Sequence, residues 1–417
     1  MRLRSVVFAA VAGLAFGALA SEQNSGPAPR SAAKVTLAPE DLALLARVIE
    51  EVGNEYVEPR TGHELLLTAV KRMVSALDPY SGLIENVSRA GLRDAMRGEF
   101  AGIGVELEIR DDLPTVISTL PDSPARAAAL RNGDRIERID GQPVKGRSLD
   151  EVIGLVKGPE RSTVVLTLLR RGETVASDLA LERRLVRFRT VELELADDFT
   201  VVRVHEFLDL TARELLDQFA RQPLERLQHG VVLDLRGNPG GVVDAAVEMA
   251  SLFLPPQVLV MTVEGRPGTR PQPRLTAPPY PVLADAASPR ARLVRLLAEV
   301  PLTVLVDSQT ASSAEIVAAA LQAHRRARVI GCEHSMGKGS IQSIIQITPG
   351  YALKMTTARY RTPDGRSLDG AGVLPDVTVA AAPSACAADP ALALAAARSE
   401  LGRQRELARS AGPRAGS

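Results

Sequence analysis

Apolar residues recur at helical spacing over the first patterned region of the chain. They follow one another every three or four positions: Leu42, Leu45, Ile49 and Val52. Such a stripe is typical of helices that bury one face. A residue before proline avoids the helical conformation, so Pro59 and Pro79 break the region into pieces. We therefore expect an N-terminal helical region over residues 39–97.

Short apolar runs separated by turn signals follow over residues 98–186. The expected strands are 100–107, 135–139 and 163–170, and the expected helices are 124–130 and 148–156. Asn132-Gly133 and Asp140-Gly141 are dipeptides typical of tight turns between such elements. From its pattern alone, this region is a small β-rich domain.

Strands and helices alternate over residues 187–383. The expected strands are 200–206, 231–235, 257–263, 302–306, 327–331, 340–347 and 351–360, and the expected helices are 211–227, 242–253, 289–300 and 313–324. This alternation implies a layered α/β core. Residues 265–281 carry six prolines and are expected to form a long surface loop or lid.

The two ends of the chain differ from the rest in composition. Two early arginines precede a short apolar run that ends in Ala18-Leu19-Ala20, so we expect residues 1–20 to be a signal peptide. The protein would then be exported to the periplasm or cell envelope, and it would be membrane-anchored if the segment is not cleaved. Residues 21–38, rich in Ser, Pro, Gly and Ala, are expected to be a flexible leader. Residues 384–417 are expected to be a flexible or partly helical tail.

Charge and cysteine content narrow the function classes. Lys+Arg and Asp+Glu balance at 50 each and tryptophan is absent, so the sequence gives no reason to expect nucleic-acid binding. With 45% hydrophobic and 24% charged residues the chain is globular rather than disordered. There are two cysteines, Cys332 and Cys386. Although export leads to an oxidising compartment, we expect two free thiols rather than a bridge.

Ser312 lies where an expected apolar strand gives way to an Ala-rich helix. At a helix N-terminus, free N–H groups and the positive end of the helix dipole favour developing negative charge. A serine in this position is a candidate nucleophile. Ser312 and Glu315 also have the spacing of a capping box. From this stretch alone, capping and catalysis both stay open.

Lys338 stands between two glycines, Gly337 and Gly339. In water a lysine has a pKa of about 10.4 and cannot act as a base at neutral pH. Buried without a carboxylate partner, its pKa falls to about 7–8 and the amine can accept a proton from a serine. Gln342 could hold the amine by a hydrogen bond without adding charge. The alternative is a surface lysine in a hairpin turn.

Gly240 and Gly241 follow the buried strand expected at 231–235. Glycines in such a turn expose their N–H groups. Together with the Ser313 amide, they could form an oxyanion hole. Taken alone, the segment is also an ordinary junction between a strand and a helix.

Neither a cofactor nor a metal is expected. The segment from Gly331 to Lys338 is similar to a phosphate-binding loop, but five residues rather than four separate its glycines. Gly339 also stands where a Ser or Thr would hold Mg²⁺. The five histidines lack the spacing of metal ligands.

Taken together, the motifs resemble those of the carboxyl-terminal processing peptidases, also called tail-specific proteases. The shared motifs are Tyr56-Val57-Glu58-Pro59, Leu77-Asp78-Pro79-Tyr80-Ser81, Phe100-x-Gly102-Ile103-Gly104, Ser123-Pro124-Ala125, Asn132-Gly133-Asp134-Arg135-Ile136, Asp234-Leu235-Arg236-x-Asn238-Pro239-Gly240-Gly241, Ala311-Ser312-Ser313-Ala314-Glu315-Ile316, Gly337-Lys338-Gly339-Ser340-Ile341-Gln342, Tyr360-x-Thr362-Pro363-x-Gly365-Arg366-Ser367 and Pro375-Asp376. The loop before Lys338 is one residue longer than is usual in this family. Ala323 stands where some members carry a functional Asp, which favours a Ser-Lys-Gln site.

The resemblance implies a fold: an α/β crotonase-like (ClpP-like) peptidase core at 187–383, an inserted PDZ domain at 98–186 and the helical region beside them. It also implies a serine endopeptidase with Ser312 as nucleophile, Lys338 as general base and Gln342 orienting the base. In such PDZ modules the substrate's last residues add a strand beside the domain's first strand. The positions that would hold the carboxyl terminus are Gly102, Ile103, Gly104 and Val105.

The implied partners are protein or peptide substrates with free C-termini. The resemblance leaves room for an adaptor protein and for a homo-oligomer. A different class of function also stays open at this point, namely a catalytically silent PDZ scaffold that binds peptides. Cleavage of an unstructured substrate distinguishes the two.

Overall fold

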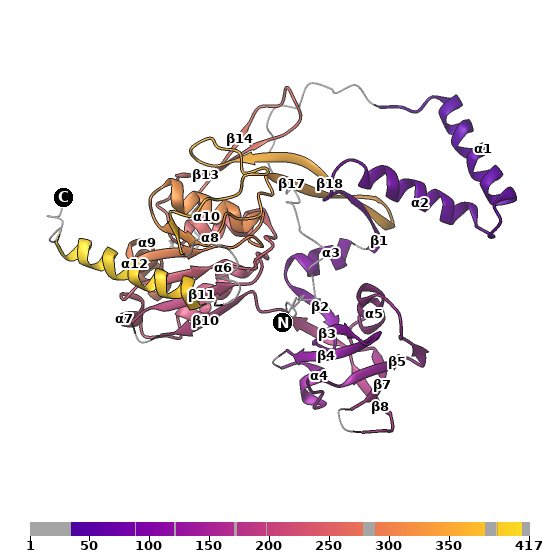
Figure 1. Cartoon of the computed structure of the whole chain (residues 1–417), viewed down its shortest axis with the longest axis horizontal. Helices are drawn as coiled ribbons and strands as arrows, with labels where there is room; N and C mark the ends of the chain where they lie inside the picture. The colour runs from indigo at the N-terminus through magenta and orange to yellow at the C-terminus, as the bar shows by residue number, and fades with distance from the viewer. Residues whose placement is uncertain are drawn as a thin grey trace.

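The computed structural model describes residues 35–87, 89–120, 122–170, 173–196, 198–277, 288–379, 389 and 391–410. The expected signal peptide and most of the expected leader lie outside these residues. Figure 1 shows an α/β core, a β-rich lobe beside it and a pair of N-terminal helices that projects from them. No helix within the described part of the chain is long and apolar enough to cross a membrane.

The core is built on a mostly parallel six-stranded sheet. Its strands are, in spatial order, β10 (Val191–Leu195), β11 (Thr200–Val204), β12 (Val231–Asp234), β15 (Leu302–Leu305), β16 (Arg328–Gly331) and β19 (Val377–Thr378). Only β10 runs antiparallel to its neighbour. Because parallel neighbours all end at one edge of a sheet, the loops after β11, β12, β15 and β16 meet there.

Alternation along these strands divides their side chains between two cores. Val202, Leu233 and Val304 face one apolar cluster, which is shared with α8 (Val243–Ser251) and α10 (Ser313–Ala323). The intervening side chains face a second cluster with α12 (Ala391–Ser410), whose Leu401 is fully buried. The helical part of the expected tail is therefore a packed layer of the core.

A second, antiparallel sheet covers α10. Its strands are β1 (Gly82–Val87), β18 (Gly350–Arg361), β13 (Leu259–Glu264) and β14 (Gln272–Leu275), and β17 (Ser340–Thr348) also pairs with β18. Two predictions are wrong here. The expected helical region contains the strand β1, and the expected Pro-rich loop contains β14, which lies at the sheet edge where proline is tolerated.

The remaining core helices follow the prediction with one change. They are α6 (Thr211–Phe219), α7 (Leu224–Leu227) and α9 (Pro289–Glu299), and the N-terminal helices are α1 (Pro39–Glu55), α2 (Gly62–Ser75) and α3 (Arg89–Met96). The helix expected over 211–227 is two helices, because Pro223 cannot continue α6.

The β-rich lobe has its own core, separate from that of the α/β part. Its elements are β2 (Glu99–Gly102), β3 (Val105–Arg110), β4 (Leu113–Thr119), α4 (Pro124–Ala127), β5 (Arg135–Ile139), β6 (Gln142–Pro143), α5 (Leu149–Val156), β7 (Thr163–Leu169), β8 (Ser177–Glu182) and β9 (Arg184–Arg187). The single strand expected over 100–107 is interrupted at Gly104, whose φ is +70°. A Cβ there would lie 2.3 Å from the Cβ of Ser123, so only glycine fits this break.

Cys332 is disulfide-bonded, so the prediction of free thiols is wrong. The chain's other cysteine, Cys386, lies outside the described residues. Their separation in the sequence hides any proximity in the fold, and two cysteines give no pattern from which to infer a bridge.

Candidate active site

Three loops from neighbouring parallel strands bring the expected site residues to one edge of the core sheet. The loop after β12 carries Gly240 and Gly241, the loop after β15 carries Ser312, and the loop after β16 carries Lys338. Buried Asn238 joins the first of these loops to the end of β11 and to the Ser312 loop, because its side chain donates to the Val204 carbonyl at 2.7 Å and its backbone carbonyl accepts from the Ala311 amide at 2.9 Å.

Ser312 has a strained backbone, with φ 54° and ψ −117°. A non-glycine residue in this conformation persists only where its surroundings hold it, and such residues cluster at functional sites. The Ser312 amide donates to the Glu315 carboxylate at 2.8 Å, and its carbonyl accepts from the Ile316 amide at 3.0 Å. Gly240 leaves the space for this turn, since a Cβ there would lie 2.7 Å from that of Ser312.

The Glu315 carboxylate holds the lysine loop against the serine turn. Fully buried, it also accepts from three groups of that loop: the Ser335 hydroxyl at 2.5 Å and the amides of Gly337 at 2.7 Å and Lys338 at 2.9 Å. Burial raises the pKa of Glu315, and these hydrogen bonds act in the opposite direction. The capping-box spacing identified one of its four contacts.

The Lys338 amine is withdrawn from water. Lys338 is 3% exposed, and its Nζ lies 4.8 Å from the centre of the Tyr80 ring. Burial lowers the pKa of Lys338 to about 8; the charge of Lys354 lowers it as well, whereas two nearby carboxylates, Glu315 and Asp78, act in the opposite direction.

Neither carboxylate forms an ion pair with Lys338 among the described residues. Asp78 accepts from the Tyr80 amide and from both the amide and the hydroxyl of Ser81, and Glu315 faces the donors given above. The amine therefore lies near negative charge without a direct counter-ion.

Tyr360 lies between the backbone carbonyls of Ser312 and Lys338. Its buried hydroxyl donates to the Lys338 carbonyl at 2.9 Å and lies 3.3 Å from the Ser312 carbonyl. Among the described residues, the side chains of Ser312 and Lys338 form no hydrogen bond with each other. Hydrogen bonds between catalytic side chains commonly form only once substrate is bound, so the expected pairing of Ser312 with Lys338 stays a prediction.

Tyr360→Phe is expected to lower kcat about ten-fold with KM nearly unchanged, because it loosens the spacing of Ser312 and Lys338 without touching the substrate. It also leaves the buried Lys338 carbonyl without this donor, at a cost of about 1–2 kcal/mol. Steady-state kinetics on a fluorogenic peptide and a melting curve check both effects. An equal rise in KM at constant kcat would contradict the positioning role.

Two backbone amides at the serine turn lack an acceptor among the described residues, those of Ser313 and Gly241. The third expected donor differs, because the Gly240 amide already donates to the Asn238 side chain at 2.8 Å. Gly241 has no room for a side chain, since a Cβ would lie 2.0 Å from the Phe207 carbonyl oxygen. Open amides can hold an anionic oxygen, so the expected oxyanion role of Ser313 and Gly241 stays a prediction.

Gln342 is buried on β17, close to the lysine loop in sequence. Its amide nitrogen donates to the hydroxyls of Ser340 at 2.9 Å and Thr356 at 3.2 Å. No hydrogen bond to Lys338 is formed within the described structure, so its orienting role stays a prediction.

The expected peptide site lies on the β-rich lobe. β3 ends the order of its sheet and leaves one edge open, and α5 packs beside it. The amides of Ile103 and Gly104 donate to none of the described residues, whereas their carbonyls accept from Ala125 and Leu120. An open strand edge with free amides at its start is the geometry for adding a peptide strand.

Sequence reasoning missed three residues around Lys338. Tyr80 and Tyr360 were noted only as parts of motifs, and Glu315 only as a cap. Nothing in their spacing indicated that they meet at the lysine. As for metals, no group of three or more His, Cys, Asp or Glu residues in the described chain could hold one.

Comparison with known proteins places this chain in a family. Residues 198–379 match peptidase family S41, and residues 115–170 match the PDZ domain. The chain is 34% identical over 342 residues to the carboxy-terminal-processing protease of Bartonella bacilliformis, which covers 81% of this chain and 75% of that protein.

Two less similar proteins also carry protease names. A probable CtpA-like serine protease of Staphylococcus aureus is 30% identical over 340 residues, covering 81% of this chain and 65% of that protein. Among solved structures, the photosystem II D1 C-terminal processing protease is 26% identical with a TM-score of 0.45, covering 82% of this chain and 93% of that one. From the sequence identity and its extent, the chain belongs to the carboxy-terminal-processing proteases of peptidase family S41, with a PDZ domain.

Proposed function

We propose that this protein is a serine endopeptidase that cleaves exported proteins near their C-termini, with Ser312 and Lys338 as its catalytic pair on a crotonase-like core. The observation that carries the proposal is the burial and the lowered pKa of the Lys338 amine. Lys338 is buried, has a pKa lowered to about 8 and lacks a direct counter-ion in the described structure. Its loop is fastened by Glu315 to the strained turn of Ser312.

In the proposed reaction, Ser312 Oγ attacks the scissile carbonyl while the neutral Lys338 amine takes its proton. The C=O π pair moves onto oxygen, where the Ser313 and Gly241 amides stabilise the charge. Collapse of this intermediate breaks the C–N bond, and Lys338 gives the proton to the leaving amine. Water then hydrolyses the acyl-enzyme by the same steps, with Lys338 again as base. Gln342 orients the amine.

We propose that the PDZ domain holds the substrate's C-terminus at Gly102–Val105. A peptide with a free C-terminus is expected to be cleaved with a kcat/KM about ten-fold higher than its amidated twin, because the amide cannot supply the carboxylate that the open amides bind. Mass spectrometry locates the cut, and Ser312→Ala protein controls for contaminating proteases. Failure to cleave either peptide would leave the peptide-binding scaffold as the function.

Export also belongs to the proposal. Two observations support it. A disulfide at Cys332 persists in an oxidising compartment, such as the one outside the cytoplasm. The basic residues and the apolar run at the start of the chain are typical of a signal peptide. The proposal also leaves room for an adaptor protein that presents substrates and for a homo-oligomer of this chain.

A further inference from the structure

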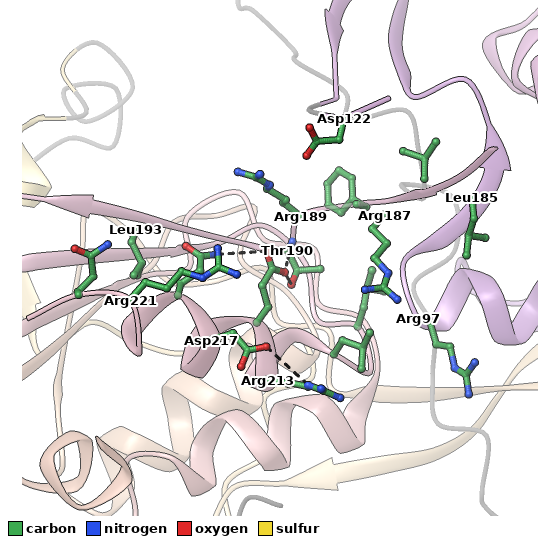
Figure 2. A pocket seen from close by; sticks show the side chains of 17 residues that line it. Arg97, Asp122, Leu185, Arg187, Arg189, Thr190, Leu193, Arg213, Asp217 and Arg221 are labelled. Atoms are coloured by element: carbon green, nitrogen blue, oxygen red, sulfur yellow. Dashed lines mark hydrogen bonds and ion pairs between the residues drawn. The ribbon is translucent and has the colours of Figure 1, made fainter. Parts of the chain in front are cut away.

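A large cleft lies away from the proposed catalytic and PDZ sites. It has a volume of about 810 Å³, and none of Ser312, Lys338 or Gly102–Val105 lines it. One side is the segment from β9 to β10 that joins the PDZ domain to the core, and another is α6 and the turn after it (Figure 2). This volume is in the range of ligand sites, about 300–1,000 Å³.

The cleft carries an excess of positive charge. Five arginines line it, namely Arg97, Arg187, Arg189, Arg213 and Arg221, against three carboxylates, namely Asp122, Glu214 and Asp217. Figure 2 shows the arginines distributed around the cleft.

Two of the carboxylates are already engaged. Glu214 accepts from the amide and the hydroxyl of Thr190 at 2.9 and 2.8 Å. Asp217 pairs with Arg213 and with Arg290. Their negative charge is therefore largely committed to partners inside the fold.

Three of the arginines lack an ion pair among the described residues, although the charge of Arg97 acts on the carboxyl of Asp209 and opposes the rise of its pKa. Arg97, Arg189 and Arg221 form no ion pair and no side-chain hydrogen bond within the described residues, whereas Arg187 pairs with Glu99 at 2.8 Å. A guanidinium group offers a planar fork of donors that suits carboxylates. Arg189 and Arg221 therefore favour an anionic ligand.

Apolar side chains complete the lining, including Leu185, Leu193 and Leu208. A ligand that satisfies both features carries carboxylates and apolar groups together. Nucleic acid is a poor fit, because the chain has no net charge to supply a broad basic field.

We propose that this cleft binds an acidic peptide segment containing apolar residues, through Arg189 and Arg221. Such a peptide would contact both the PDZ-side residue Leu185 and the α6 side of the core, and so bridge the two domains. The inference is independent of the proposed catalysis, because it concerns binding alone.

The test uses the full chain as Ser312→Ala, so that no probe is cut. The probe is a fluorescein-labelled peptide of alternating Glu and Leu with an amidated C-terminus, which withholds the carboxylate that the PDZ domain would take. Fluorescence anisotropy is expected to show saturable binding that weakens about ten-fold in Arg189→Glu/Arg221→Glu and weakens with added salt. The matched control, Arg266→Glu/Arg270→Glu in the exposed turn after β13, should bind like the parent.

Three outcomes would overturn the proposal. They are equal affinity in the two double variants, equal binding of a Lys-Leu peptide, and no saturation below about 1 mM, beyond which binding is too weak to be a site. Vesicles containing phosphatidylserine form a further arm. If they bind in an arginine-dependent way while the Glu-Leu peptide does not, the cleft recognises lipid rather than peptide.

Discussion

Lys338→Met is expected to reduce peptide cleavage about a thousand-fold or more, to the level left by Ser312→Ala, while making the fold more stable. The activity is lost because, in the proposed reaction, the Lys338 amine takes the serine proton and methionine has no amine. If Ser312 and Lys338 act as the proposed pair, the double variant should be no worse than either single one. Initial rates on a fluorogenic peptide measure all three.

The stability gain follows from the lowered pKa. At pH 7 the lysine is protonated in both the folded and unfolded chain, so a fall from 10.5 to about 8 means that burying the charge costs about 3 kcal/mol. This penalty shrinks as the pH rises from about 8 towards 10.5, because the folded form releases its proton first. The advantage of the methionine variant should shrink over the same range.

The pH profile of the unmodified enzyme tests the same amine. Activity should rise with an apparent pKa near 8, since only the neutral amine can accept a proton. Lys145→Met, at an exposed lysine of the PDZ domain, is the matched control and should leave rate, profile and melting temperature unchanged. A rate that keeps climbing through pH 10 would contradict a desolvated Lys338.

Glu315→Gln is expected to lower kcat about a hundred-fold and the free energy of unfolding by about 2–4 kcal/mol. The carboxylate accepts hydrogen bonds from four donors of the two catalytic loops. A glutamine has one carbonyl oxygen and turns its amide donors towards some of these groups. The Ser312 turn and the Lys338 loop would then lose their shared anchor.

The pH profile of the Glu315→Gln variant distinguishes a loss of loop positioning from a general loss of stability. The Glu315 charge raises the pKa of Lys338, so its removal should shift the apparent pKa of the remaining activity downward. Glu299→Gln, at an exposed position ending α9, is the control and should change neither kinetics nor melting. Wild-type kcat in the Glu315 variant would show that the loops hold their geometry without it.

The pattern of the sequence was enough to place most of the α/β core. β11, β12, β15 and β16 lie within a residue or two of their predicted spans, because buried parallel strands are continuous apolar runs between turns. The edge strands β10 and β19 carry no such run and were missed. β1 was taken for helix, since its short mixed segment becomes a strand only by pairing with β18.

The candidate site residues, too, were partly predictable from the sequence. Local motifs made Ser312, Lys338 and the glycine turn candidates, because a serine at a helix start and a lysine between glycines have short-range signatures. The resemblance to a peptidase family rested on these motifs and is confirmed by the comparisons.

By itself, then, the sequence determined which segments form the central strands of the core, the family to which the chain belongs, and Ser312 and Lys338 as the candidate pair. The tertiary structure decided the surroundings that give the pair its properties: Tyr80 above the amine, Tyr360 between the two carbonyls, Glu315 across the two loops and the disulfide at Cys332. A pKa depends on burial and on charges brought together from distant segments. Local spacing in a chain carries no record of either.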